Sequence, residues 1–315
     1  MEEVTLGEFI KQRRKKLGLT QLEVCEGICE PITLSRLEHG RHITSDLRIS
    51  ALLGRLGLPD NRHLTVLSKR EMEINNLQKA IQDEEVRFRR AGSSERPDVR
   101  ERALKKLDSL ERVAKKDNNL IQQYILGARV TFGKPDGPYS PDERMDMLMQ
   151  AIRLTVPRFD VENIGQFRYS MEETKLINQL AVAYSDADER KIALKIYKQL
   201  LTYVEREDKS LPRFAGHFCM IAHNYAIVLT HEKRYKEAIT LAKCGQQICA
   251  ERGHYQLLPG FLAIQAECFF FVGDYESSKK LYRQAYWIYD AIGDRDNCSI
   301  MEQEAKDHLD LNISC

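Results

Sequence analysis

Positively charged side chains gather in two short segments near the start of the chain. KQRRKK covers residues 11–16, and RLEHGRH covers residues 36–42. Lysine and arginine side chains neutralise phosphate groups, the contact that supplies most of the non-specific affinity for nucleic acid. We therefore expect a DNA interface here, with phosphate contacts from Arg13, Arg14, Arg36 and Arg41.

Residues 30–36 include candidates for contacts with base edges. Thr33 and Arg36 could reach base edges. Glu30 could accept a hydrogen bond from a cytosine amino group, and Ile32 could contact a thymine methyl group. Residues 1–64 contain ten Lys/Arg and nine Asp/Glu, so this part of the chain is not basic overall. Affinity would then depend on local geometry and on pairing two such domains, rather than on bulk charge.

Signals for the starts and ends of helices surround these residues. Thr5 and Thr20 are suitable N-caps, and Glu23 completes the pattern of a capping box with Thr20. Pro31 suits the first turn of a helix, and Gly40 suits its end. The sequence therefore predicts short helices over the segments 5–18, 19–28, 31–39 and 45–58.

This series of helices resembles the Cro/repressor-like (Xre-type) helix-turn-helix. The resemblance is carried by LTQLEVCEGIC, LSRLEHGR and ISALLGRLGL. It implies that Gln21 contacts a phosphate group and that the helix over 31–39 enters the major groove. We expect this DNA-binding domain to cover residues 1–62.

A single long helix is predicted after this domain, over residues 64–90. Apolar side chains recur there every seven residues, at Leu67, Ile74, Ile81 and Phe88. The partner positions Arg70, Leu77 and Glu84 are mostly polar, which does not support a strict coiled coil. Two interpretations stay open for this linker, residues 63–92. It packs on its own C-terminal domain, or it also lies at a dimer interface.

The rest of the chain, residues 95–315, repeats a helical pattern. ERKIALKIYKQLL (189–201), RYKEAITLAKCGQQI (234–248) and DYESSKKLYRQAYWI (274–288) align with one another. The helix before each has a small residue where two helices must cross closely, at Ala181, Ala226 and Ala266. This is the pattern of tetratricopeptide repeats, in which paired A and B helices stack into a superhelix. Two weaker pairs are expected at 98–132 and 141–184, and the whole protein is predicted to be all-α.

The A helices of such a superhelix line its concave surface, where polar side chains can bind a peptide backbone. Asn178 and Asn224 lie early in successive A helices. Lys175 could bind a terminal carboxylate. These residues and their neighbours form the candidate peptide-binding set: Lys175, Asn178, Gln179, His223, Asn224 and Glu267.

A helix-turn-helix followed by these repeats resembles the RRNPP family, the cytoplasmic peptide-pheromone receptors of Gram-positive bacteria. EGICEPITLSRLE and MQAIRLTVPRFD also resemble that group. The resemblance implies a homodimer that binds an operator in double-stranded DNA. It also implies a repeat domain that binds a short signalling peptide and so controls DNA binding in quorum sensing. The alternative is a DNA-binding repressor whose repeats bind a protein partner instead of a free peptide.

Composition excludes several other classes of protein. The chain is 43% hydrophobic and 30% charged with a net charge of +1, and no apolar run approaches the roughly 18–20 residues that a membrane span needs. The N-terminus is polar, so we expect a cytoplasmic protein without a membrane partner. The eight cysteines form no CxxC, and Cys25 and Cys29 are expected to face the core as reduced thiols. No metal site, no cofactor and no enzymatic motif is predicted.

Overall fold

The computed structural model describes residues 5–25, 27–41, 49, 52–53, 55–56, 69–114, 118–133, 137–167, 169–206 and 212–313. All regular structure in these residues is helical, which confirms the predicted all-α class. Contacts divide the chain into two units, residues 1–79 and 80–315, and the division falls inside the predicted linker helix. No helix of the described residues is both long and apolar enough to cross a membrane.

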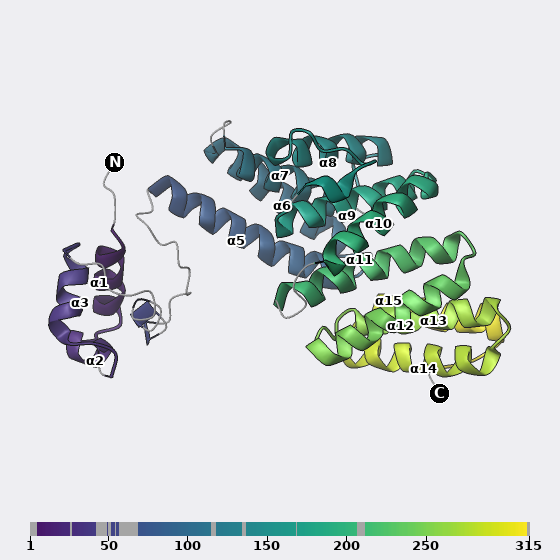
Figure 1. Cartoon of the computed structure of the whole chain (residues 1–315). Helices are drawn as coiled ribbons and strands as arrows, with labels where there is room; N and C mark the ends of the chain where they lie inside the picture. Colours follow the sequence, from purple (N-terminus) through teal and green to yellow (C-terminus); the bar gives the residue numbers. More distant parts are fainter. Residues whose placement is uncertain are drawn as a thin grey trace. The chain divides into compact units, whose positions relative to one another are not determined.

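The first unit contains α1 (Leu6–Lys16), α2 (Gln21–Cys25) and α3 (Pro31–Glu38), which Figure 1 shows near the N-terminus. Each starts as the sequence signals indicate. The Thr5 side chain accepts a hydrogen bond from the Glu8 amide at 3.2 Å. The Thr20 side chain accepts one from the Glu23 amide, while the Glu23 carboxylate accepts one from the Thr20 amide. Pro31 occupies the first turn of α3.

A small apolar core holds these helices together. Ile10, Val24 and Leu34 are fully buried, and Leu52, Leu53 and Leu56 of the predicted fourth helix join them. The rest of that fourth helix lies largely outside the described residues. Gly7 permits the close crossing of α1 and α3, because a Cβ atom there would lie 1.9 Å from the Leu37 carbonyl oxygen. The core therefore fixes which side of α3 remains at the surface.

The linker helix, α5, runs over Lys69–Arg90, and residues 57–68 lie outside the described part of the chain. Ile81 and Phe88 are buried, as their spacing predicts, and the Phe88 ring packs edge-to-face on Phe132 at 5.4 Å. Glu84 is also buried, with only 1% of its side chain exposed, and forms an ion pair with Lys106 of α6 (Arg96–Val113). The C-terminal half of α5 thus packs on the second unit by both apolar and ionic contacts.

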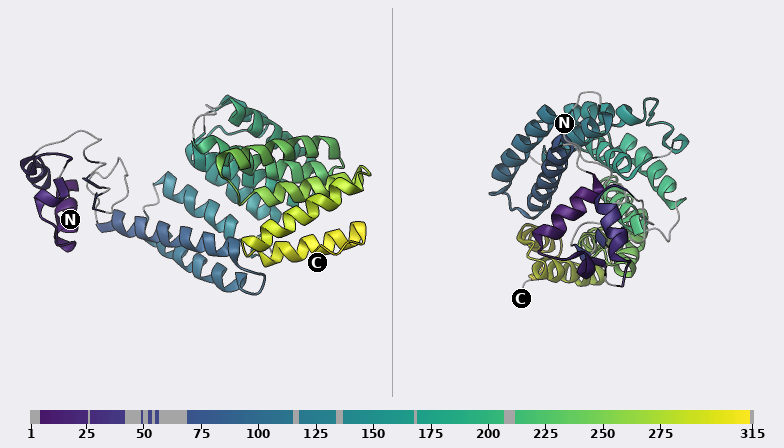
Figure 2. Two further views of the ribbon diagram at one scale, coloured as in Figure 1. Left: turned by 90° about the horizontal axis from the view of Figure 1, so that it is seen from below. Right: turned by 90° about the vertical axis from the view of Figure 1, so that its left-hand side faces the viewer.

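The second unit stacks helical hairpins (Figure 1). The hairpins pair α7 (Asn119–Phe132) with α8 (Pro141–Thr155), α9 (Met171–Asp186) with α10 (Arg190–Glu205), α11 (Pro212–His231) with α12 (Tyr235–Arg252), and α13 (Leu258–Phe271) with α14 (Tyr275–Ala291). A final helix, α15 (Arg295–Leu309), packs on α13 and α14, and a short 3-10 helix covers Ile164–Gln166. In the right-hand view of Figure 2, the helices of this unit follow an arc.

Small side chains make the close crossings in this stack, as the repeat alignment predicts. Ala181, Ala226 and Ala266 are fully buried. A Cβ atom on Gly245 would lie 2.2 Å from the Phe261 ring, so this glycine permits α12 and α13 to approach each other. The helices of the two expected weaker pairs are present and in contact, α6 with α7 over 98–132 and α8 with α9 over 141–184, and α7 also packs on α8.

Candidate functional site

The face of α3 that remains at the surface carries most of the predicted base contacts. Leu34, Leu37 and Glu38 point into the first unit. Ile32 is 59% exposed, Glu30 and Arg36 are also exposed, and Thr33 is half-buried. Arg41, just beyond the end of the helix, is exposed as well. The exposed surface of α3 and its two ends therefore offers an apolar side chain, a carboxylate and guanidinium groups for contact with DNA.

Arg14 and Gln21 are engaged inside the unit instead. The guanidinium of Arg14 donates to both carboxylate oxygens of Glu38, at 2.6 and 2.8 Å, and to the Leu19 carbonyl at 3.0 Å. Gln21 Nε2 donates to the same carboxylate at 2.9 Å. Burial works to raise the pKa of Glu38, but these hydrogen bonds outweigh it and hold the pKa below its usual value. These contacts give Arg14 a structural role in place of the expected phosphate contact, and they use one donor of the Gln21 amide group.

Arg13 is also partly committed to the first unit. Its Nε donates to the carbonyl of Leu56 at 3.1 Å, and the side chain is half-buried. The guanidinium has further donors beyond Nε. Arg36 and Arg41 are more exposed than Arg13. We therefore place Arg36 and Arg41 first among the proposed phosphate contacts.

The candidate peptide-binding residues divide into a connected group and separate ones. Asn224 Nδ2 donates to Asn178 Oδ1 at 3.2 Å, which links α11 to α9. His223 Nδ1 lies 3.4 Å from Asn224 Oδ1. Because an amide oxygen only accepts, this contact requires the proton of His223 on Nδ1. Burial disfavours the charged ring and lowers the pKa of His223.

The other three candidates lie apart from this group. Gln179 Nε2 donates to the Thr131 hydroxyl of α7 at 2.6 Å. Lys175 is exposed and pairs with Glu172 at 2.8 Å on the same helix. Glu267 lies on α13, where burial raises its pKa. Thus Asn178, Asn224 and His223 are in mutual contact, while Gln179, Lys175 and Glu267 have other surroundings.

Sequence reasoning missed a polar group beside Glu267. Burial, together with the Glu267 carboxyl, raises the pKa of Glu304 to about 7. The Tyr282 hydroxyl lies 2.9 Å from Nδ1 of His308. Glu304 and His308 belong to α15, which has no counterpart in the repeat alignment. The pattern of small residues that identified the repeats therefore gave no signal for them.

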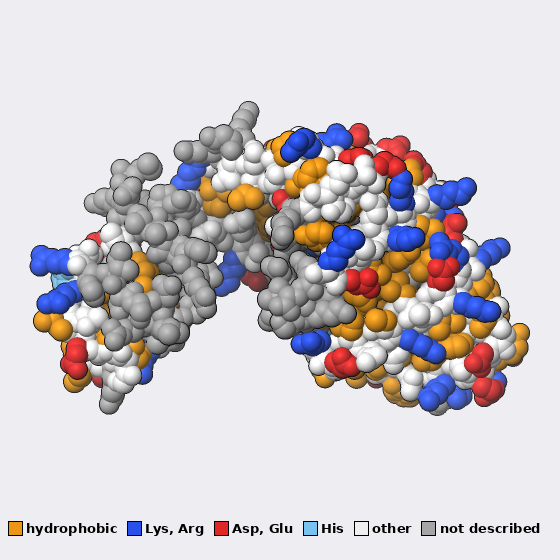
Figure 3. Space-filling view, viewed as in Figure 1, with side chains coloured by type: hydrophobic (Ala, Val, Ile, Leu, Met, Phe, Trp, Pro, Cys, Tyr) orange, Lys and Arg blue, Asp and Glu red, His pale blue; other side chains and the backbone are white. Residues whose placement is uncertain are grey.

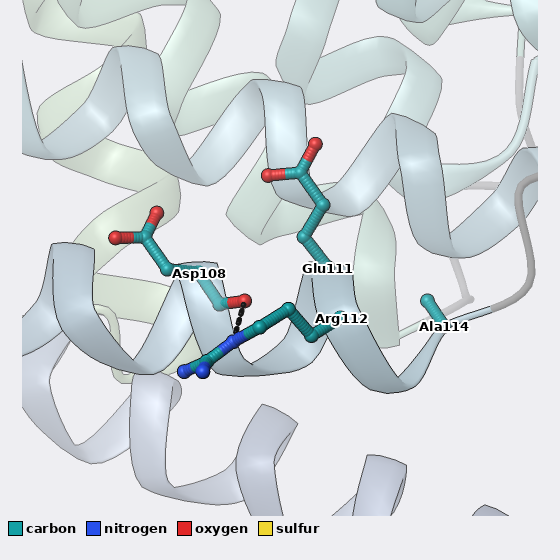
Figure 4. A pocket seen from close by; sticks show the side chains of 4 residues that line it. All are labelled: Asp108, Glu111, Arg112 and Ala114. Carbon is teal, nitrogen blue, oxygen red and sulfur yellow. Dashed lines mark hydrogen bonds between the residues drawn. The ribbon is translucent and has the colours of Figure 1, made fainter.

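A hollow of about 460 Å³ lies at the end of α6, lined by Asp108, Glu111, Arg112 and Ala114 (Figure 4). Arg129 bridges Asp108 and Glu111, at 2.7 and 2.8 Å. None of the predicted site residues lines this hollow. Across the described ranges, no three His, Cys, Asp or Glu side chains lie close enough to hold a metal ion. On the face of the second unit that Figure 3 shows, both signs of charge are interspersed with hydrophobic side chains.

Two family models match the chain. A helix-turn-helix model matches residues 10–61, and the model of the RNPP family C-terminal domain matches residues 144–309. The chain belongs to the RNPP family. The family model includes α9, α11 and α13, and therefore the Asn178–Asn224 pair.

Solved structures with the same fold span almost the whole chain. PlcR of Bacillus thuringiensis, in complex with the peptide PapR7 and DNA, has a TM-score of 0.69 at 16% identity, over 95% of this chain and 99% of that one. ComR of S. thermophilus, with DNA and its signalling peptide ComS, has a TM-score of 0.55 at 12% identity, over 95% and 98%. The SHP pheromone receptor Rgg2 of Streptococcus dysgalactiae has a TM-score of 0.54 at 15% identity, over 96% of this chain and 100% of that one. No curated protein sequence matches this RNPP chain.

Proposed function

We propose that this RNPP protein is a DNA-binding transcription regulator whose repeat unit binds a short signalling peptide and so controls DNA binding. The observation that carries the proposal is the link between Asn178 and Asn224. It places two amide side chains from successive A helices within 3.2 Å of each other. An extended peptide presents N–H and C=O groups that must find partners when buried, and amide side chains supply both a donor and an acceptor.

The DNA-binding part of the proposal rests on the first unit. The exposed Ile32 and Arg36 lie on one face of α3, Glu30 immediately precedes the helix, and the opposite face is fixed in the core. In the proposed complex, α3 lies in the major groove of an operator, and Arg36 and Arg41 contact phosphates. PlcR and ComR were each solved in complex with both a peptide and DNA, which supports the same pair of ligands here.

The test measures DNA binding with and without peptide. A labelled duplex from the neighbourhood of the protein's own gene would be titrated with the full-length protein, alone and with short peptides encoded beside the gene. We expect one peptide to shift the apparent Kd for DNA, and the variant Asn178→Ala to lose that shift while it still binds DNA. Lys236→Ala, an exposed change on the B helix α12, serves as the matched control. A duplex that binds tightly but responds to none of the peptides would contradict the peptide part of the proposal.

A further inference from the structure

Two cysteine thiols lie in contact at the turn that leads into α3. Cys25 ends α2, and its Sγ lies 3.5 Å from the Sγ of Cys29. The Cys29 amide donates to the Cys25 carbonyl at 3.0 Å, as in one turn of helix. A disulfide bond needs about 2.05 Å between the sulfurs, so the two atoms must approach each other by only about 1.5 Å.

We propose that Cys25 and Cys29 form an oxidation site for hydroperoxides, and that the resulting disulfide weakens DNA binding by the helix-turn-helix. Oxidation of the pair does not depend on the proposed function, whereas its effect on DNA binding rests on it. The chemical partner is a small hydroperoxide, such as hydrogen peroxide, because only a small molecule can reach a half-buried thiol.

Exposure distinguishes the roles of the two sulfurs. Cys29 is half-buried, whereas Cys25 is only 1% exposed. Burial, with the neighbouring Cys29 thiol, raises the pKa of Cys25 to about 12. Because the thiolate is the nucleophile toward peroxides, Cys25 does not react first at neutral pH. Cys29 is therefore the thiol that reacts with the peroxide. The Cys25 thiol then attacks the oxidised Cys29 sulfur.

The reaction balances in two steps. The Cys29 thiolate attacks one oxygen of hydrogen peroxide, the O–O bond breaks, and a sulfenic acid forms while hydroxide leaves and takes up a proton as water. The Cys25 sulfur then attacks the Cys29 sulfur, the S–S bond forms, the S–OH bond breaks, and the Cys25 proton leaves with the hydroxyl group as water. Two thiols and one peroxide thus give one disulfide and two waters.

The disulfide would act on α3 because of where the pair lies. Cys25 belongs to the same core as Leu34, and α3 begins at Pro31, two residues after Cys29. Drawing Cys29 toward α2 therefore displaces the first turn of α3. That turn carries Ile32, and Glu30 immediately precedes it. A recognition helix displaced at its N-terminus loses contacts with base edges.

A second thiol pair provides an internal comparison. Cys219 and Cys249 of the second unit lie even closer, with 3.3 Å between their Sγ atoms, but both are 0% exposed. If distance alone controlled oxidation, this pair would react first. If access controls it, Cys25 and Cys29 react while Cys219 and Cys249 remain thiols.

The experiment measures both disulfide formation and DNA affinity on the full-length protein. After limited treatment with hydrogen peroxide and alkylation of free thiols, trypsin releases residues 17–36 as one peptide that holds both cysteines. We expect this peptide to lose two hydrogens and to escape alkylation, while Cys219 and Cys249 stay reduced. Affinity for a duplex selected from a random library by the reduced protein should fall about tenfold, the loss typical of one misplaced base contact, and recover with a reductant.

Two variants separate the steps. Cys29→Ser forms no disulfide, so its DNA affinity should not change with peroxide. Cys25→Ala leaves the Cys29 sulfenic acid unresolved, so that dimedone labels it. The proposal is overturned if both thiols remain free when the exposed Cys244 is oxidised, or if the disulfide forms and DNA affinity stays the same. Failure to select any duplex would instead count against the proposed function, because the mass measurement does not depend on it.

Discussion

At the scale of single residues, Glu38 organises the surface from which α3 would contact DNA. Its carboxylate is buried and accepts hydrogen bonds from Arg14 of α1 and Gln21 of α2. One side chain therefore joins α1, α2 and α3. Removing one partner of a buried ion pair leaves an uncompensated charge, which usually destabilises a protein by about 3–5 kcal/mol.

We predict that Glu38→Ala lowers the free energy of opening of the first unit by about 3 kcal/mol. Hydrogen exchange of the amides in residues 5–41 measures this quantity without requiring the two units to unfold together. Glu8→Ala, at an exposed position in α1, is the matched control. Equal exchange rates in the two variants would show that Glu38 does not hold the unit together.

The same carboxylate predicts a dependence on pH. The hydrogen bonds from Arg14 and Gln21 outweigh burial, so the pKa of Glu38 in the folded protein lies below its unfolded value. The stabilisation is then fully present above the unfolded pKa of about 4.3 and is lost as the pH falls through the lower folded pKa. Protection of residues 5–41 should decrease over that acidic range in the wild type. In Glu38→Gln, which does not titrate, this part of the pH dependence should disappear.

Charge in the sequence indicated the DNA-binding segment but could not separate its arginines by role. Arg14 and Arg36 look alike in one dimension, and only packing shows that Arg14 reaches Glu38 while Arg36 faces solvent. We predict that Arg36→Ala reduces the slope of log Kd against log salt by about one and weakens binding to all sequences alike. The measurement is a salt titration of DNA affinity. An unchanged slope would remove Arg36 from the phosphate contacts.

At the scale of elements, the ionic contact between α5 and α6 joins the linker helix to the repeats. Glu84 of α5 is 1% exposed and pairs with Lys106 and Arg102 of α6. The heptad spacing of α5 predicts Ile81 and Phe88 as buried, and Glu84 is one of the polar partner positions that do not support a strict coiled coil. The burial of this carboxylate is tolerable because α6 supplies two cations.

We predict that Glu84→Ala loosens the C-terminal half of α5 from α6, with a loss of about 3 kcal/mol in protection of residues 80–90 from hydrogen exchange. Glu101→Ala, which removes an exposed carboxylate from α6, is the control. If the exposed and the buried carboxylate have equal effects, the apolar contacts of Ile81 and Phe88 alone hold the helix.

The hairpins also show how far the repeat pattern could be read from sequence. The small residues Ala181, Ala226 and Ala266 are fully buried, as expected where two helices cross closely and leave little room for a side chain. The contact of α7 with α8 could not be read from the weaker repeat matches, although the helices of both expected pairs are present and in contact. Individual contacts between helices, such as that of Asn178 with Asn224, could not be predicted, because they depend on how the stack fixes the rotation of each helix.

At the scale of the whole molecule, the proposed function requires two copies of the chain on one operator. A single α3, with Pro31–Glu38 as its bounds, spans too few bases to select one site. We predict an operator with two-fold symmetry, in which the half-sites lie roughly one helical turn, or a multiple of it, apart. Insertion of about five base pairs between the half-sites turns one of them to the opposite side of the duplex, so affinity should fall steeply. Insertion of about ten base pairs returns both half-sites to the same side of the duplex, so affinity should recover if the linkers can span the added length. Light scattering at the same protein concentrations should give the mass of a dimer on DNA. Equal affinity for all three spacings, with one chain bound per duplex, would contradict the paired arrangement. It would show that a single α3 is enough to recognise the site.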